Sequence, residues 1–389
     1  MNIRALNIPV KRNLGLIVIV YTLIAVIASI QCYYGFIRPE NAGGRVYPNY
    51  NNYIIFKNSF FHLIHGYDLY QPFPLEQWDL YKYSPTFSFA FGIFAFLPDF
   101  IGLLCWNLMN TIPLLIGIMQ LRDISVNNKI LALLFCAVEL MGSLQNAQSN
   151  GLMAALLILT FTSLENSKYV LATFCVVFSI YLKIYGGIGL LLFLFYPFKA
   201  KLFFFTTLWV VLLGILPLLV VNLNQLLSIY TSWENLLKLD EYNSTGVSVM
   251  GILHSWFRVN ISKNQIMGFG CLLFLSPFFQ YWKYKIYNFR LLTLCVMLIW
   301  VVIFNYKAES PTYIISVAGI SIWFFSREKT KLNILIVTLA FVFTSIASGD
   351  LMPVFIRNFL TYYNIKALFS TILFFVLLID LWKNRAHAA

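Results

Sequence analysis

The sequence predicts an all-α membrane protein, and its composition, hydropathy and backbone requirements support this fold class together. Of the 389 residues, 60% are hydrophobic and 11% are charged, whereas soluble domains carry about 25% charged residues. With a mean hydropathy of +0.77, the chain cannot cover itself with polar surface in water, so it must lie in lipid. Helices are expected because backbone groups in lipid must find hydrogen bonds within their own segment. The alternation typical of outer-membrane strands is absent.

The first apolar stretch, 14–36, follows a basic N-terminus and lacks a cleavage pattern, so we expect an uncleaved span with its basic side inside. The polar segment 37–85 then becomes the first extracytoplasmic loop. Within it, apolar spacing predicts a helix over 53–65 that lies along the membrane surface and ends at Gly66.

Thirteen apolar stretches follow one another along the chain, and some are too short to cross a bilayer alone. They lie near 14–36, 86–96, 101–121, 130–144, 151–164, 169–182, 186–198, 202–221, 267–282, 291–305, 311–326, 332–348 and 367–382.

Basic clusters at 283–290, 327–331 and 383–385 place the C-terminus inside. With both termini inside, the number of crossings must be even. Either the stretch after Pro85 is re-entrant, or 169–198 forms one crossing that is broken at Lys183. We expect about twelve crossings, within a range of about 10 to 13.

The whole chain, 1–389, is expected to form a single integral membrane domain with a second extracytoplasmic loop over 222–265. The net charge of +12 comes from Lys and Arg that lie largely at span ends, so we expect membrane lipids and not nucleic acid as partners. The six cysteines lie singly and the histidines show no ligand spacing, so we expect no metal site and no cofactor.

The first loop carries an unusual density of polar side chains, among them Asn51, Asn52, Asp68, Tyr70 and Lys82. Amides hydrogen-bond pairs of hydroxyls, and aromatic rings stack on the C–H faces of sugars. These five residues are therefore predicted to face a cleft that binds a polar substrate. The plainer interpretation is a membrane-edge helix with an aromatic belt.

Other polar side chains are scattered between the apolar stretches. They are Gln148 and Asn150 at a span junction, Lys183 and Tyr185 between two stretches, Asn243 and Ser244 before a helix expected over 247–257, His254 on that helix and Arg258 directly after it. A capped helix start is a natural anion site, and the basic residues would add charge for a lipid phosphate. A structural cap with a snorkelling arginine is the alternative.

Two carboxylates remain. Glu309 follows Lys307 at the outer face, which indicates either an ion pair or a catalytic carboxylate. Glu139 lies within an apolar run, where an unpaired charge is costly, so we expect it to pair with a lysine such as Lys183.

The order of these motifs resembles glycosyltransferase family 87, whose members include α-mannosyltransferases of mycobacterial lipids. The matching stretches are residues 51–70, Tyr83-Ser84-Pro85 with 97–110, NAQSNG at 146–151, LKIYGG at 182–187 and the run from Asn243 to Phe257. They correspond to the family's D-x-x-x-Y…G-x-x-x-Y loop, its Y-x-P span start, its G-Q-x-N junction, its K-x-Y-P pivot and its N-Q-S helix start.

The resemblance implies a GT-C-type helical bundle in the plasma (inner) membrane, with its active site beneath the first loop and facing the periplasm or outside. It implies a polyprenyl-phosphate donor, a hexose such as mannose, a lipid or glycan acceptor, and inversion by a carboxylate base without a metal. The sequence contains no nucleotide-binding motif that would argue for another donor.

The family's catalytic Asp falls at Asn51 or Asn52, and an amide is no general base. Glu309, then Asp68, then Glu40 are the candidates to replace it. Alternatively, the chain is a catalytically inactive partner, or a transporter or flippase of lipid-linked sugars. The residues predicted to bind substrate are Asn52, Tyr70, Lys82, Gln148, Asn150, Lys183, Tyr185, Asn243, Ser244, His254, Arg258 and Lys307.

Overall fold

The structure is a computed structural model that describes residues 7–37, 45–239, 245–259, 262–347 and 352–383. In these ranges the chain is helical apart from one antiparallel pair of two-residue strands, β1 (Phe36–Ile37) and β2 (Tyr47–Pro48). Phe36 lies opposite Pro48, so the pair closes the base of the first loop. The prediction of an all-α fold is confirmed.

The helices alternate along the chain with short turns. The α-helices are α1 (Asn7–Tyr34), α2 (Asn51–Ile64), α3 (Pro85–Ala95), α4 (Asp99–Met119), α5 (Val126–Gln145), α6 (Asn150–Glu165), α7 (Tyr169–Leu182), α8 (Lys199–Ile215), α9 (Leu223–Leu239), α10 (Val249–Phe257), α11 (Lys263–Leu275), α12 (Tyr287–Ile303), α13 (Tyr313–Phe325), α14 (Lys331–Ala340), α15 (Val354–Tyr362) and α16 (Ile365–Lys383). The 3₁₀ segments are η2 (Ile184–Phe195), η3 (Leu216–Leu219), η4 (Ser276–Phe279), η5 (Tyr281–Lys283) and η6 (Ser310–Thr312), and η7 (Phe341–Ile346) is a π-helix.

Five of the described helical segments are long and apolar enough to cross a bilayer: 13–34, 99–119, 126–145, 199–219 and 365–383. Seven shorter apolar helices of 10–17 residues accompany them. The chain therefore has the helices of a membrane protein, while the expected twelve crossings and the GT-C arrangement stay predictions.

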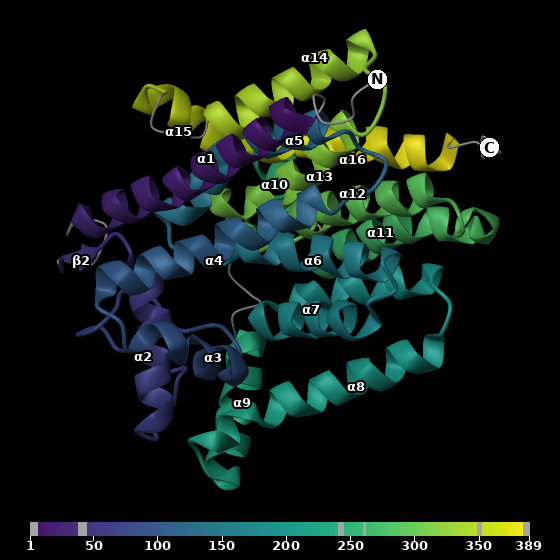
Figure 1. Ribbon diagram of the computed structural model, residues 1–389. Coiled ribbons are helices and arrows are strands. Elements are labelled where there is room, and N and C mark those ends of the chain that lie inside the picture. The colour runs from purple at the N-terminus through teal and green to yellow at the C-terminus, as the bar shows by residue number, and fades with distance from the viewer. Residues whose placement is uncertain (1–6, 38–44, 240–244, 260–261, 348–351, 384–389) are drawn as a thin grey trace.

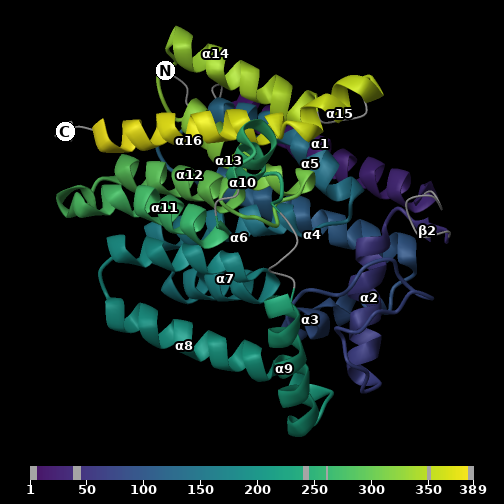
Figure 2. The same ribbon diagram turned by 180° about the vertical axis from the view of Figure 1, so that it is seen from behind.

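Most helices run roughly parallel to one long direction of the molecule (Figure 1). The helices α2 and α3 and the strand β2 lie at one end of that direction, which we call the loop end. The helix α16 finishes at the other end, the basic end. Seen from behind, α11, α12 and α16 cover the opposite face (Figure 2). Almost every residue of α6 and α13 is buried, as expected for helices at the centre of a bundle.

The stretch 169–198 is not one broken crossing. Gly189 approaches Val176, and Gly186 approaches Ser179 closer to the bend, so that a Cβ built on either glycine would lie within 3 Å of these partners. These two pairs of residues are centred on the same point of the sequence. The segments α7 and η2 therefore run antiparallel, as a hairpin with its turn at Lys183. The prediction that 169–198 forms one broken crossing was therefore wrong. The other alternative, a re-entrant stretch after Pro85, remains, and the helix at that place, α3, has eleven residues.

Two regions differ from expectation in their helix content. The segment 222–265 was expected as a polar loop with one helix, but it contains both α9 and α10. In α9, Leu226 and Ile229 are buried, and Gln225 donates to the carbonyl of Leu63 on α2. The helix α15 was not predicted. In the first loop, the expected helix 53–65 is observed as α2, whose buried face packs on α3.

Candidate active site

The turn between α5 and α6, residues 146–149, connects most of the elements at the loop end. Ala147 adopts a positive φ of 48°, and its carbonyl accepts a hydrogen bond of 2.9 Å from the indole of Trp106 on α4. Gly151 follows, where a Cβ would lie 2.8 Å from the carbonyl oxygen of Asn110. Glycine therefore allows α6 to begin against α4, which fixes the direction in which the turn presents its side chains.

From this turn a continuous chain of hydrogen bonds joins a cation to a carboxylate. The Nζ of Lys183 donates to Oδ1 of Asn150 at 2.7 Å, and Nδ2 of Asn150 donates to Oε1 of Gln148. The Nε2 of Gln148 donates to Oε2 of Glu309 at 2.6 Å. We call these four residues the polar relay. The bends after α5, α7 and α12 supply them, so segments up to 161 residues apart meet here.

The cationic end of the polar relay lies between two aromatic rings. The Lys183 ammonium is 5.7 Å from the ring centre of Tyr83 and 5.9 Å from that of Tyr185. Burial lowers the pKa of Lys183 to about 8, while the nearby charge of Glu309 works in the opposite direction. The Tyr185 hydroxyl is buried without a hydrogen-bond partner among the described residues, which is costly unless a ligand or water fills the place.

The carboxylate end is exposed but firmly supported. Glu309 caps η6, and its backbone N–H donates to the hydroxyl of Thr312 at 3.2 Å. The next residue, Ser310, accepts a hydrogen bond of 2.9 Å from Lys366. The same Lys366 ammonium lies 2.9 and 3.0 Å from the two oxygens of Glu139. The expectation that Glu139 pairs with a lysine is confirmed, but its partner is Lys366 and not Lys183.

The first loop reaches this turn through α2. The Nδ2 of Asn52 donates to the carbonyl of Asn146 at 2.8 Å, two residues before Gln148. Asn51 is buried, and its Oδ1 accepts a hydrogen bond from the backbone N–H of Trp78 at 3.1 Å. Asn51 thus holds the loop in place through its carbonyl oxygen.

The other predicted residues of the first loop form hydrogen bonds and ion pairs with residues of the same loop. Asp68 accepts hydrogen bonds from the backbone N–H of Tyr70 and from Gln71, and Lys82 pairs with Asp79 at 3.3 Å. Tyr70 is buried and donates to the carbonyl of Tyr83, so it positions one ring beside Lys183. Within the described part of the chain, neither Asp68 nor Lys82 forms a hydrogen bond or ion pair with the polar relay.

The residues on and around α10 are placed differently from expectation. Its N-terminus is occupied by Ser248, whose Oγ accepts from the N–H groups of Met250 and Gly251. His254 and Arg258 are exposed toward the other end of this nine-residue helix, about 8 Å and about 14 Å along its axis from Val249. Among the described residues no hydrogen bond joins either of them to Lys183, and their shared role at one phosphate stays a prediction.

Some predictions concern other parts of the second loop and the outer turn. Asn243 and Ser244, like Glu40, lie outside the described residues. The Lys307 ammonium lies 5.6 Å from the ring centre of Tyr306, and the residue belongs to the same turn as Glu309.

Sequence reasoning missed two contributors to the site. Tyr83 was noted only as part of a motif, although its hydroxyl lies 3.3 Å from that of Ser149 and its ring lies beside Lys183. Lys366 opens the last span, where a cation at a span end carries no signal of its own. Its pairing with a residue 227 positions earlier could not be inferred from spacing.

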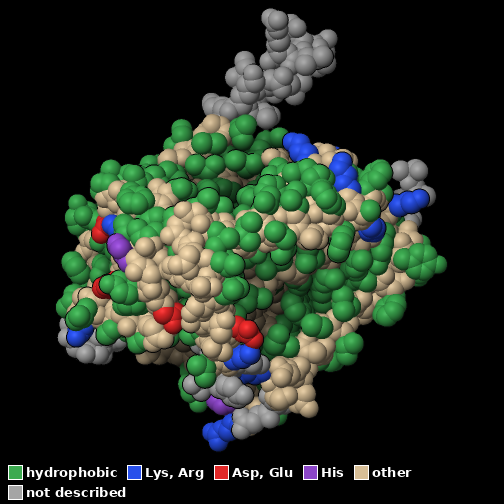
Figure 3. All heavy atoms as spheres, turned by 90° about the horizontal axis from the view of Figure 1, so that it is seen from below, with side chains coloured by type: hydrophobic (Ala, Val, Ile, Leu, Met, Phe, Trp, Pro, Cys, Tyr) green, Lys and Arg blue, Asp and Glu red, His purple; other side chains and the backbone are tan. Residues whose placement is uncertain are grey.

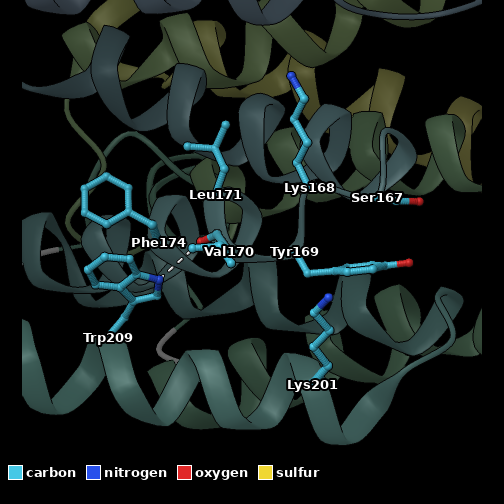
Figure 4. A pocket seen from close by; sticks show the side chains of 8 residues that line it. All are labelled: Ser167, Lys168, Tyr169, Val170, Leu171, Phe174, Lys201 and Trp209. Carbon is cyan, nitrogen blue, oxygen red and sulfur yellow. Dashed lines mark hydrogen bonds between the residues drawn. The ribbon is translucent and has the colours of Figure 1, made fainter.

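A groove of about 440 Å³ lies far from this cluster. It is formed by the start of α7 and by α8, with Tyr169, Phe174, Lys201 and Trp209 among its walls (Figure 4). The sixteen residues of α6 separate Asn150 from this end of the bundle. The groove therefore belongs to a different part of the molecule.

Comparison with known families adds one finding. The profile of glycosyltransferase family 87 matches residues 81–349, more than half of the chain. The match includes all four residues of the polar relay and begins after Asn51 and Asp68. No curated protein matches the sequence.

Proposed function

Because the chain belongs to glycosyltransferase family 87, we propose that it transfers a hexose, mannose being the first candidate, from a polyprenyl-phosphate donor to a lipid or glycan acceptor. The reaction inverts the anomeric centre and uses no metal. The site lies at the loop end, which faces outward from the inner membrane.

The polar relay is the observation that supports this proposal. A single-displacement reaction needs a base on one face of the sugar and a stabilised leaving group on the other. Lys183 and Glu309 stand at opposite ends of the relay, with the side chains of Asn150 and Gln148 between them. Those two amides are suited to hydrogen-bond sugar hydroxyls, so the sugar ring would lie along them.

Glu309 is the proposed general base. Its exposed carboxylate takes the proton from the acceptor hydroxyl as the acceptor oxygen attacks the anomeric carbon. The bond between that carbon and the donor's phosphate oxygen breaks at the same time. Gln148 holds one carboxylate oxygen at 2.6 Å, which leaves the other oxygen for the acceptor.

Lys183 is the proposed phosphate ligand. An ammonium between two rings, with a pKa of about 8, is charged at neutral pH and would stabilise the negative charge that develops on the leaving phosphate. The unpartnered hydroxyl of Tyr185 would donate a second hydrogen bond.

The test is hexose transfer by the purified protein in lipid vesicles. Polyprenyl-phosphate-mannose, labelled in the sugar, is supplied together with an extract of membrane lipids as acceptors. We expect Glu309→Gln to lower the rate about 10²- to 10⁴-fold, the usual contribution of a general base. Asp68→Asn is the matched control, since this carboxylate only caps its own turn, and it should retain activity. Full activity in Glu309→Gln would exclude Glu309 as the base.

A further inference from the structure

The groove beside α8 has a polar end and an apolar end. Figure 4 shows the Ser167 hydroxyl, the Tyr169 hydroxyl and the Lys201 ammonium on one side of it, with the rings of Phe174 and Trp209 on the other. Trp209 lies eight residues after Lys201 on α8, a distance of about 12 Å along the helix axis. The groove is therefore as long as a headgroup with the first part of an acyl chain.

The apolar part of the groove is built and held by side chains. The indole of Trp209 donates to the carbonyl of Val170 at 3.2 Å, and its ring packs edge-on against Phe174 at 5.1 Å. In the apolar segment 199–219, which contains α8, only 17% of the most apolar 18-residue window is buried within the protein. Because most of this helix is not covered by the rest of the protein, an acyl chain can enter the groove from the side.

The polar part carries positive charge that no carboxylate offsets. The Lys201 ammonium lies 5.3 Å from the ring centre of Tyr169, and neither Lys201 nor the neighbouring Lys168 has an acidic partner in the described part of the chain. Lys168 also lines the groove, but its ammonium points away from Lys201 and Trp209 (Figure 4). Glu165, the nearest carboxylate in sequence, is bound by Arg290 at 2.6 and 2.9 Å.

The same charge asymmetry extends over this face of the molecule. In the space-filling view from the side of α8 and α9, the visible acidic side chains lie on the half nearer the loop end (Figure 3). The basic end shows Lys and Arg among hydrophobic side chains. A ligand that is apolar along its length and anionic at its head complements both features.

We propose that the groove binds one anionic glycerophospholipid, with its headgroup phosphate at Lys201 and Ser167 and one acyl chain along Phe174 and Trp209. The site is separate from the proposed transfer reaction, since α6 spans the distance between the two. It gives the protein a lipid preference in the leaflet at its basic end.

Fluorescence quenching of Trp209 tests this proposal in the full-length protein. The protein is reconstituted in vesicles that contain phosphatidylglycerol or phosphatidylcholine with brominated acyl chains, and the Trp209 contribution is the difference between the wild type and Trp209→Phe. We expect stronger quenching of this contribution by the phosphatidylglycerol. Lys201→Gln should lower the preference about fivefold, because one basic residue near an anionic lipid contributes about 1 kcal/mol.

Lys329→Gln is the matched control, because Lys329 is an exposed cation at the same end of the bundle, in the connector after α13. It should leave the preference unchanged. Equal quenching of Trp209 by the two lipids would overturn the proposal. So would a preference that persists in Lys201→Gln, or one that Lys329→Gln removes to the same extent.

Discussion

At the scale of single residues, the polar relay explains why a few polar side chains in an apolar chain can form a site. Each of its members lies in a bend or at the first residue of an apolar helix, and each is noticeable in the sequence for that reason. Three amide or ammonium hydrogen bonds, between 2.5 and 2.7 Å in length, hold them in one line. The sequence predicted all four residues, but it could not give their order or their partners.

The pH dependence of transfer tests the state of Lys183. Burial lowers its pKa to about 8, so the ammonium loses its proton as the pH rises through that value, and the proposed phosphate contact weakens. We expect kcat/KM to fall above about pH 8, measured between about pH 6.5 and 9.5. Lys183→Arg keeps its charge throughout this range and should remove the fall, even if its rate is lower. A wild-type profile that stays flat to the upper limit would contradict the assignment.

Asn51 stands where the family resemblance places a catalytic Asp, and its geometry indicates a structural role instead. Its Oδ1 accepts from Trp78, and a carboxylate can accept the same bond. We therefore expect Asn51→Asp to transfer hexose within about threefold of the wild-type rate and Asn51→Leu to loosen the loop. Hydrogen exchange of residues 73–83 reports the loosening. A large gain of activity in Asn51→Asp, by 10-fold or more, would mean that the base belongs in the first loop.

At the scale of elements, helices with strong apolar periodicity could be predicted from the sequence, whereas mixed helices could not. The bounds of α7 agree with the predicted stretch 169–182. The helix α9 was missed because its polar face, with Asn224, Gln225 and Glu234, lowers the average hydropathy of the segment. Only its contacts with α2 and α3 show which face is buried, and those contacts are tertiary.

The bend that carries Glu309 depends on a buried ion pair between two other elements. Glu139 of α5 and Lys366 of α16 are 4% and 7% exposed, so Lys366→Met leaves an uncompensated buried carboxylate. We expect this change to destabilise the protein by about 3–5 kcal/mol, seen as a lower melting temperature in detergent. Glu139→Gln combined with Lys366→Met should recover much of that loss.

Lys238→Met serves as the control for this series, because its pair with Glu234 is exposed on α9, and it should leave the melting temperature unchanged. If Lys366→Met were as stable as this control, the ion pair would not support the Glu309 turn.

At the scale of the whole molecule, the helical bundle separates two kinds of surface. The helices α2 and α3 lie at the loop end, and the connectors after α11 and α13, which carry Lys and Arg, lie at the basic end (Figure 1). The sequence predicts this division from charge, because basic residues follow every second predicted span in the C-terminal half, and its relation to the two faces of the membrane stays a prediction. The sequence could not predict how far each bend lies from the end of the bundle, because that position depends on how helices of unequal length pack.

Labelling of single cysteines tests the proposed orientation. In a background without the six native cysteines, Lys82→Cys marks the loop end and Lys329→Cys marks the basic end. A membrane-impermeant maleimide added to intact cells should react with the first and not with the second. Reaction of both from the same side would contradict the placement of the two ends on opposite faces of the membrane.

The most direct test of the account is the position of the donor's phosphate. A cryo-EM map of the protein with a bound polyprenyl phosphate should show the phosphate at hydrogen-bond distance from Nζ of Lys183, between the rings of Tyr83 and Tyr185. Density for the phosphate at Arg258 or in the groove at Lys201, with Lys183 still bound only to Asn150, would contradict it.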